Sequence, residues 1–376
     1  MEMKKLLLMM AVTTMAIPSM AQQQLKSGLS LADMDQSARP GDDFFTYACG
    51  GWMKANPLPA AYSRYGSFDR LAENNTKRIN GILKELQENS YAEGTVERKL
   101  SDLYKMAVDT DRREKDGLSP VQPILKRLEA AKTTSQLFAI QKEMMPAGAP
   151  MFYGAGIGAD EMNATQNILG VNQGGLTLGQ KDYYLENDPA TTKIREAYKL
   201  HIVKMFRLFG FKTGAAQKKM QNVMKIEMAL AKVSRSNTQL RDPKANYNKM
   251  TLQEFQSKYP HLQLEQLMNA KGIDSKYLQT LVVGQPDFMA GAEKVIAGLS
   301  APAYRDWMEW RIINGAANLL NDEAAQASFD FYGKVMAGRK ENHPLWRRAT
   351  SQVEGVMGEA LGKIYTEKYF PASSKK

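Results

Sequence analysis

The chain has 376 residues, of which 43% are hydrophobic and 24% charged, and its formal net charge is +10. These proportions are ordinary for globular proteins and exclude a disordered chain, while the length suits one large or two ordinary domains. A basic balance can indicate nucleic-acid binding, but Lys and Arg alternate with acidic residues throughout and no basic stripe is interleaved with aromatic residues, so we expect no nucleic acid as a partner.

The first residues are typical of a secretory signal. Two lysines precede a short apolar run, residues 6–17, and small residues mark a cleavage point at Ala21. We therefore expect residues 1–21 to be a signal peptide cleaved after Ala21, and residues 22–40 to be a flexible segment. The protein is predicted to be exported, periplasmic or secreted. We expect no transmembrane segment, because no other apolar run approaches the length of a membrane span.

From residue 41 onward the chain is predicted to be mostly helical. Four aromatic residues gather between Phe44 and Trp52, and they need a surface that buries them. After them, apolar side chains recur every three to four residues, with the first stripe starting at Leu71, which predicts a series of helices. The stripes cover residues 71–86, 96–107, 121–128, 194–209, 223–230, 304–320 and 346–369.

One region interrupts the helical pattern. Residues 149–178 are rich in glycine and β-favouring residues, and Phe152–Ile157 and Ile168–Val171 are predicted to be short strands, with Gly174-Gly175 as a turn. The predicted fold class is therefore mainly α, a multi-helix lobe with a small β element.

The residues that could perform hydrolysis are sparse. Zinc hydrolysis needs three protein ligands, but only His201, His261 and His343 exist and no two are four residues apart, so no H-E-x-x-H face is possible. His201 continues the apolar stripe of its helix and is predicted to be a core residue. Cys49 is the only cysteine, which excludes an internal disulfide, and no histidine lies near it in sequence. We expect no catalytic and no metal-ligating residue in this chain.

A segment from Tyr62 to Arg70 is of more interest. Arg64 could grip a carboxylate through two parallel hydrogen bonds, and Asp69 lies close enough in sequence to hold it in place. The plainer interpretation is a surface ion pair worth about 0–1 kcal/mol, and spacing alone favours it.

Several motifs together resemble one family. The opening motifs are Asp43-Phe44-Phe45, Tyr47-Ala48-Cys49-Gly50-Gly51-Trp52 and Ser63-Arg64-Tyr65-Gly66-Ser67-Phe68-Asp69. The later motifs, in the expected order, are Gly175-Leu176-Thr177-Leu178-Gly179, Asp182-Tyr183-Tyr184-Leu185, Arg241-Asp242-Pro243, Tyr247-Asn248-Lys249-Met250-Thr251, Trp310-Arg311 and Trp346-Arg347-Arg348. From about Met34 onward the chain thus resembles the amino-terminal domain of the neprilysin and endothelin-converting-enzyme family of zinc metalloendopeptidases, to which bacterial oligopeptidase O also belongs.

The resemblance implies a two-lobed enzyme that cuts oligopeptides. In such an enzyme a zinc lobe carries H-E-x-x-H and a downstream Glu, and a helical lobe gates access to it. Residues 41–376 are expected to form that helical domain, with residues 41–75 and 346–376 packed on the catalytic lobe. The resemblance implies that Arg64 contacts the end of the substrate and that Asp69 steadies it. A second family arginine falls on Ala72, so Arg70 is the candidate to replace it.

The departures from the family pattern predict an incomplete enzyme. The zinc motif and the segment that holds substrate backbone are both missing, so we expect a truncated chain that is inactive alone, with zinc bound only in the intact family enzyme. Whether the chain is itself an enzyme is left open. The alternative function is a standalone, non-catalytic peptide-binding module, and a complete hydrolase with an unfamiliar site is disfavoured.

Overall fold

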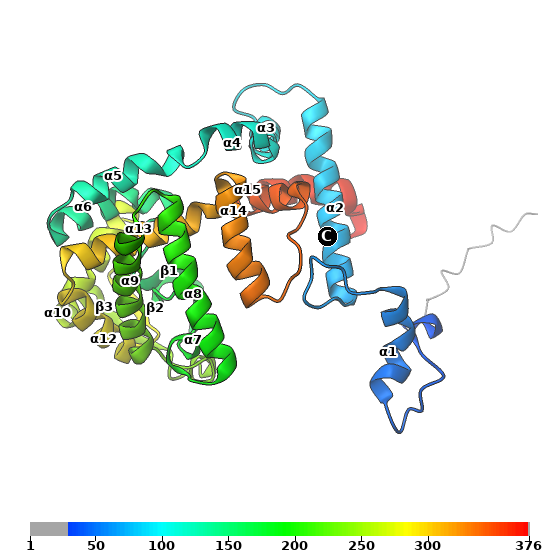
Figure 1. Ribbon diagram of the computed structural model, residues 1–376, viewed down its shortest axis with the longest axis horizontal. Helices are drawn as coiled ribbons and strands as arrows, with labels where there is room; N and C mark the ends of the chain where they lie inside the picture. Colours follow the sequence, from blue (N-terminus) through cyan, green and yellow to red (C-terminus); the bar gives the residue numbers. More distant parts are fainter. Residues whose placement is uncertain (1–28, 375–376) are drawn as a thin grey trace, which may run out of the picture. The chain divides into compact units, whose positions relative to one another are not determined.

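The computed structural model describes residues 29–374 (Figure 1). The chain divides into two compact units, Met1–Pro59 and Ala60–Lys376, and each is described by itself. The predicted signal peptide, residues 1–21, lies outside the described residues. Within them, no helix is long and apolar enough to cross a membrane.

Among the described residues of the first unit, 29–59, there are two short elements, a 3₁₀ turn η1 (Leu31–Asp33) and the helix α1 (Phe44–Ala55). Asp43 caps α1 by accepting a hydrogen bond from the Thr46 amide at 2.9 Å. The segment of η1 lies so close to α1 that a Cβ on Gly51 would be 2.3 Å from the Ala32 carbonyl oxygen, so only glycine fits there. The aromatic cluster of the sequence is thus a helix, and Phe44 and Phe45 at its start are exposed within the residues described.

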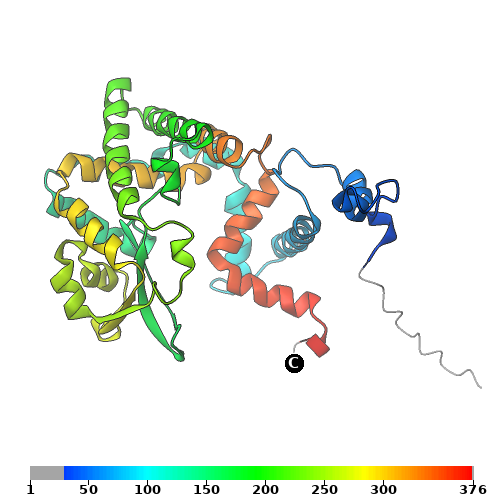
Figure 2. The ribbon, with the colours of Figure 1, turned by 90° about the horizontal axis from the view of Figure 1, so that it is seen from below.

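The second unit is mostly helical and contains one small sheet, with α2, α3 and α15 lying away from that sheet (Figures 1 and 2). Its helices are α2 (Ser67–Glu88), α3 (Val96–Val108), α4 (Thr110–Asp116), α5 (Gln122–Ala130), α6 (Thr134–Met144), α7 (Asp182–Leu185), α8 (Pro189–Leu208), α9 (Thr213–Val233), α10 (Leu252–Lys258), α11 (Leu264–Ala270), α12 (Pro286–Ala297), α13 (Ala301–Ala316), α14 (Asp322–Ser328) and α15 (Leu345–Tyr369). A π-helical segment, η8 (Phe329–Met336), continues α14, and shorter 3₁₀ turns join the other elements. The predicted fold class, mainly α with a small β element, is confirmed.

The sheet has four strands in the order β1-β2-β4-β3. β1 (Tyr153–Asp160) and β2 (Asn163–Gln173) form an antiparallel hairpin whose tip extends away from the core, as Figure 2 shows. β4 (Thr280–Val283) runs parallel to β2, and β3 (Asn248–Thr251) pairs antiparallel with β4. Both predicted strands therefore exist, but the last two were missed because each is only four residues long.

The glycines predicted to turn lie where the chain leaves β2. Gly175 has a φ of +78°, and a Cβ there would be 2.6 Å from the Phe152 carbonyl oxygen. A side chain is therefore excluded by both backbone conformation and space.

Three buried clusters hold the second unit together. The first packs the sheet against α6 and α9–α13, and the second joins α8, α9, α13, α14 and η8. Helix α13 belongs to both, because Trp307 is buried in the first cluster and Trp310 in the second. Its residues are buried all round, which explains why its sequence shows little amphipathic contrast.

The third cluster joins α2, α3 and α15 (Figure 2). Asn80 on α2 donates hydrogen bonds to the Tyr104 hydroxyl of α3 at 2.6 Å and to the Thr350 hydroxyl of α15 at 3.1 Å. The predicted stripe of α2 is buried from Ile82 onward, but Leu71 at its start is 57% exposed, so its assignment to that stripe was wrong. Leu71 lies in the first turns of α2, ahead of the buried stretch of the helix, and has no cover within this unit.

Candidate functional site

The segment that carries Arg64 is fixed to the loop before α15. The Ala60 carbonyl oxygen accepts hydrogen bonds from the amides of Lys340 at 2.9 Å and Glu341 at 3.1 Å. Tyr62 then packs edge-on against His343 with 5.2 Å between ring centroids, and its hydroxyl accepts a hydrogen bond from Arg347. Two stretches at least 280 residues apart in sequence thus form one structure.

The other side of Arg64 is anchored to α2. The Tyr65 hydroxyl donates to the Glu73 carboxylate at 3.0 Å, and its ring packs against Tyr62 with 5.1 Å between centroids. Burial and the nearby Glu73 carboxylate raise the pKa of Tyr65, so its hydroxyl remains a donor. Arg64 therefore lies between Tyr62 and Tyr65, whose side chains are both fixed by hydrogen bonds and ring packing.

The Arg64 side chain itself is exposed. Within residues 29–374 it forms no hydrogen bond and no ion pair with protein groups. The planar fork of a guanidinium matches a carboxylate with two parallel hydrogen bonds. This arrangement can bind an anionic group from solution.

Asp69 was predicted to hold Arg64 in place, but its hydrogen-bond partner in the structure is the Gly66 amide. Its carboxylate accepts a hydrogen bond from the Gly66 amide at 2.9 Å, which is one half of a capping box at the start of α2; Gly66 has no side chain to supply the other half. Asp69 thereby sets the direction in which the chain leaves the Arg64 segment. Arg70 is exposed in the first turn of the same helix, as is Ala72. The structure brings Arg64, Asp69 and Arg70 into one short stretch, and their contact with a substrate stays a prediction.

The three histidines lie apart in separate surroundings. His201 is buried, as predicted, and stacks on Phe331 at 5.0 Å, while His261 hydrogen-bonds Glu293 at 2.5 Å and His343 packs on Tyr62. In the part of the chain that the structure describes, no group of three His, Cys, Asp or Glu side chains is placed to hold a metal ion. The donor set of these residues does not fit a zinc centre.

A buried carboxylate that sequence reasoning missed organises several of the family-like motifs. Glu227 on α9 accepts hydrogen bonds from Thr177 at 2.5 Å, from Tyr184 at 2.7 Å and from Tyr198 at 2.9 Å. Trp310 donates to the Tyr198 hydroxyl at 2.9 Å. Burial raises the pKa of Glu227, against the effect of these donors. The signal that could have found it was a Glu inside an apolar helical stripe.

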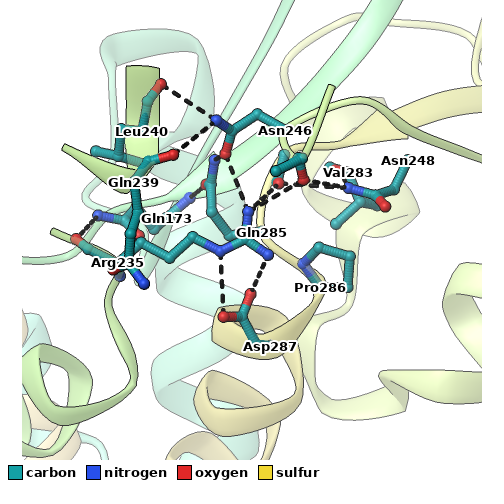
Figure 3. A network of polar contacts seen from close by, with 12 residues as sticks. Gln173, Arg235, Gln239, Leu240, Asn246, Asn248, Val283, Gln285, Pro286 and Asp287 are labelled. Atoms are coloured by element: carbon teal, nitrogen blue, oxygen red, sulfur yellow. Dashed lines mark hydrogen bonds and ion pairs between the residues drawn. The ribbon is translucent and has the colours of Figure 1, made fainter. Parts of the chain in front are cut away.

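A second polar network, drawn in Figure 3, explains the motif around residues 241–248. Arg235 donates to the carbonyl oxygen of Ala245 at 3.1 Å and pairs with Asp287 at 2.9 Å. The Asn246 side chain bridges the same region, donating to the Asp242 carbonyl at 2.6 Å and accepting from Gln285 at 2.8 Å. These contacts hold the irregular chain before β3 against the end of the sheet. Their role is structural.

Comparison with known proteins identifies the family. The model of peptidase family M13, in its amino-terminal part, matches residues 40–376. The chain therefore belongs to peptidase family M13 and corresponds to its amino-terminal domain, which confirms the resemblance seen in the motifs.

Individual relatives and solved structures support the same family assignment. Endothelin-converting enzyme 1 of Bos taurus is 28% identical over 364 residues, covering 92% of this chain and 46% of the relative. The inhibitor complex of the zinc metalloprotease Zmp1 of Mycobacterium tuberculosis matches with a TM-score of 0.86 at 27% identity, over 92% of this chain and 52% of Zmp1. PepO of Lactobacillus rhamnosis shares the fold, with a TM-score of 0.77 at 19% identity over 89% of this chain and 52% of PepO. The chain spans about half the length of the relatives it matches.

Proposed function

We propose that this chain is the substrate-gating helical part of a zinc metalloendopeptidase that cuts oligopeptides, and that the chain alone does not cut them. The observation that carries the proposal is the family match over residues 40–376, together with a span of about half of each relative. Zmp1 is a zinc metalloprotease, and the described residues offer no cluster that fits the metal. Zinc and the cleaving residues then belong to a catalytic half.

Exposed apolar side chains on α2 and α15 support docking of that half. Phe68 and Leu71 on α2 are 85% and 57% exposed, and Val356 on α15 is 71% exposed. Large side chains left in water on two neighbouring helices are typical of a surface that a partner covers. They fall in residues 41–75 and 346–376, the segments predicted to pack on the catalytic lobe.

Arg64 is proposed to hold a carboxylate of the peptide, with Asp69 and Arg70 as supporting residues. Support comes from its exposed, unpaired guanidinium and from the two tyrosines that fix its backbone. Asp69 would act by holding the start of α2 in place, and Arg70 would add positive charge one turn away.

The cleavage part of the proposal is tested on the purified chain. Metal analysis and a peptide-cleavage assay should find neither stoichiometric zinc nor turnover. Turnover that is lost with a chelator would show that the chain is a complete hydrolase.

The binding part is tested with fluorescent peptides that end in a free carboxylate or in an amide. We expect weak binding that prefers the carboxylate and falls about tenfold in Arg64→Ala, because a charge-assisted bidentate pair is lost. Arg98→Ala, at an exposed arginine of α3, is the matched control and should bind as the wild type does. Equal affinity in Arg64→Ala and wild type would remove Arg64 from the site. Strong binding by the isolated chain would favour the standalone peptide-binding module instead.

The docking part is tested by oligomeric state and by binding of an apolar dye. The wild-type chain should bind the dye and self-associate, and Phe68→Ser with Val356→Ser should reduce both. Leu200→Ser, at a side chain of α8 that is 72% exposed, is the control for a general loss of apolar surface. A monomer without dye binding contradicts the docking surface.

A further inference from the structure

A hollow of about 350 Å³ opens beside the start of α15. Its walls come from η8, the loop that follows it and the first turns of α15, with Asn318 and Ser328 from the segments before η8. Among the lining residues are three arginines, a histidine and two aromatic rings: Arg339, His343, Arg347, Arg348, Phe329 and Tyr332. Asn, Gln and Ser side chains complete the lining, and no Asp or Glu contributes to it. We call it the α15 pocket.

The arginines of the α15 pocket are not neutralised by the protein. Over residues 29–374, none of the three forms an ion pair. The Nε groups of Arg339 and Arg348 are buried without a hydrogen-bond partner. A buried donor that loses water and gains no partner is unfavourable, and so is the mutual repulsion of three cations around one hollow.

The nearest acidic groups are engaged or out of reach. Asp322, which acts on Arg348 from a distance, is paired with Arg113 at 2.9 Å. Glu354 acts on Arg347 but forms no ion pair with any described residue. The positive charge of the pocket therefore remains.

The helix adds to this charge. α15 starts at Leu345 after Pro344, without a side-chain cap and without an acidic residue in its first turn. Arg347 and Arg348 instead occupy that turn, where the positive end of the helix dipole disfavours cations and favours anions. A bound anion would interact favourably with the helix dipole. It would also accept hydrogen bonds from the unpaired donors and reduce the repulsion among the three arginines.

We propose that the α15 pocket binds a small oxyanion, a phosphate or carboxylate group, held by Arg339, Arg347 and Arg348 at the start of α15. Phe329 stacks under the Arg339 guanidinium at 5.3 Å, which orients its N–H groups. Arg347 gives one donor to Tyr62 and keeps others for the ligand. Burial and the flanking Arg347 and Arg339 lower the pKa of His343 to about 4, so near neutral pH it adds no further charge.

This site is distinct from the proposed peptide contact of Arg64. Arg64 does not line it, and binding can be measured without peptide. Failure of one proposal therefore leaves the other standing.

The test is calorimetric titration of the purified chain with inorganic phosphate at constant ionic strength, with acetate as the carboxylate arm and chloride as the blank. Saturable binding of phosphate or acetate at one site is expected, and the arm that binds more tightly assigns the ligand class. Arg339→Gln and Arg348→Gln should each weaken it at least tenfold, and Arg98→Gln should leave it unchanged.

Thermal unfolding of each variant establishes that it is folded, and Arg339→Gln, at the partly exposed rim, carries the test if Arg348→Gln does not fold. Absence of saturation with both anions overturns the proposal. So does equal affinity in a folded Arg339→Gln variant and the wild type.

Discussion

The two ends of the second unit differ in whether their charged side chains have partners. In the body around α9 and α13, Lys219 is buried between Asp306 at 2.8 Å and Glu309 at 2.5 Å, and Glu227 has three hydroxyl donors. At the α2–α15 end, Arg64, Arg339 and Arg348 form no ion pair with any described residue, and apolar side chains face water. Satisfied polar groups stabilise the fold, whereas unsatisfied ones are available to a ligand or partner.

The largest effect on stability should come from removing a buried ion pair in the body around α9 and α13. Lys219→Met removes the nearer cation from two buried carboxylates and leaves them only Arg305, at 3.7 Å from Asp306 and 3.9 Å from Glu309. The free energy of unfolding should fall by about 3–5 kcal/mol. Denaturant unfolding measures it. Lys225→Met, at an exposed lysine on the same helix, should change stability little. A loss below about 1 kcal/mol in Lys219→Met would mean that the buried pair is not formed.

The next effect is a pH dependence from His201. Burial lowers its pKa from 6.5 to about 4, so the folded state holds the neutral ring while the unfolded chain takes up a proton. The resulting stability is present above pH 6.5 and is lost as the pH falls towards 4, by about 3 kcal/mol. His201→Phe, which preserves the stacking on Phe331, should reduce this slope in unfolding curves measured from pH 4 to 8. Part of the slope should remain, because the pKa of His343 is also lowered to about 4. An unchanged slope would assign the effect to another group.

A smaller effect is expected at the start of α2. Asp69→Ala removes the hydrogen bond to the Gly66 amide and should lower stability by about 1 kcal/mol. Amide exchange in the first turn of α2 should rise with it. Asp102→Ala, at an exposed ion pair of α3, is the matched control and should cost about 0.3–0.5 kcal/mol. If the two variants are equal, the Asp69 hydrogen bond contributes nothing beyond a surface pair.

The smallest effect on stability is expected at Arg64. Arg64→Ala removes an exposed side chain with no protein partner, so the free energy of unfolding should stay within about 0.5 kcal/mol of the wild type. Combined with the predicted loss of peptide affinity, this would separate binding from folding. A marked loss of stability would place Arg64 in the packed structure instead.

Local patterns were sufficient for the longest helices. The apolar stripes predicted α2, α3, α5, α8, α9, α13 and α15. The family-like motifs were also read directly, and the family is confirmed. These features depend on residues close together in the chain.

Other features were decided only by tertiary structure. β3 and β4 are too short to stand out. β4 becomes a strand because it pairs with β2, which lies about 110 residues earlier in the chain, and β3 becomes one because it pairs with β4. Glu227 became recognisable only when Thr177, Tyr184 and Tyr198 converged on it. The α15 pocket, likewise, needs η8 beside the first turn of α15.

The sequence by itself therefore determined the helical class, the position of the β element and the family, because periodicity, caps and motif order are local properties. Tertiary structure alone decided which charged groups are paired and which are left open. Pairing depends on contacts between residues distant in the chain, as between Tyr62 and Arg347, and that contact places the Arg64 segment beside the loop that lines the α15 pocket.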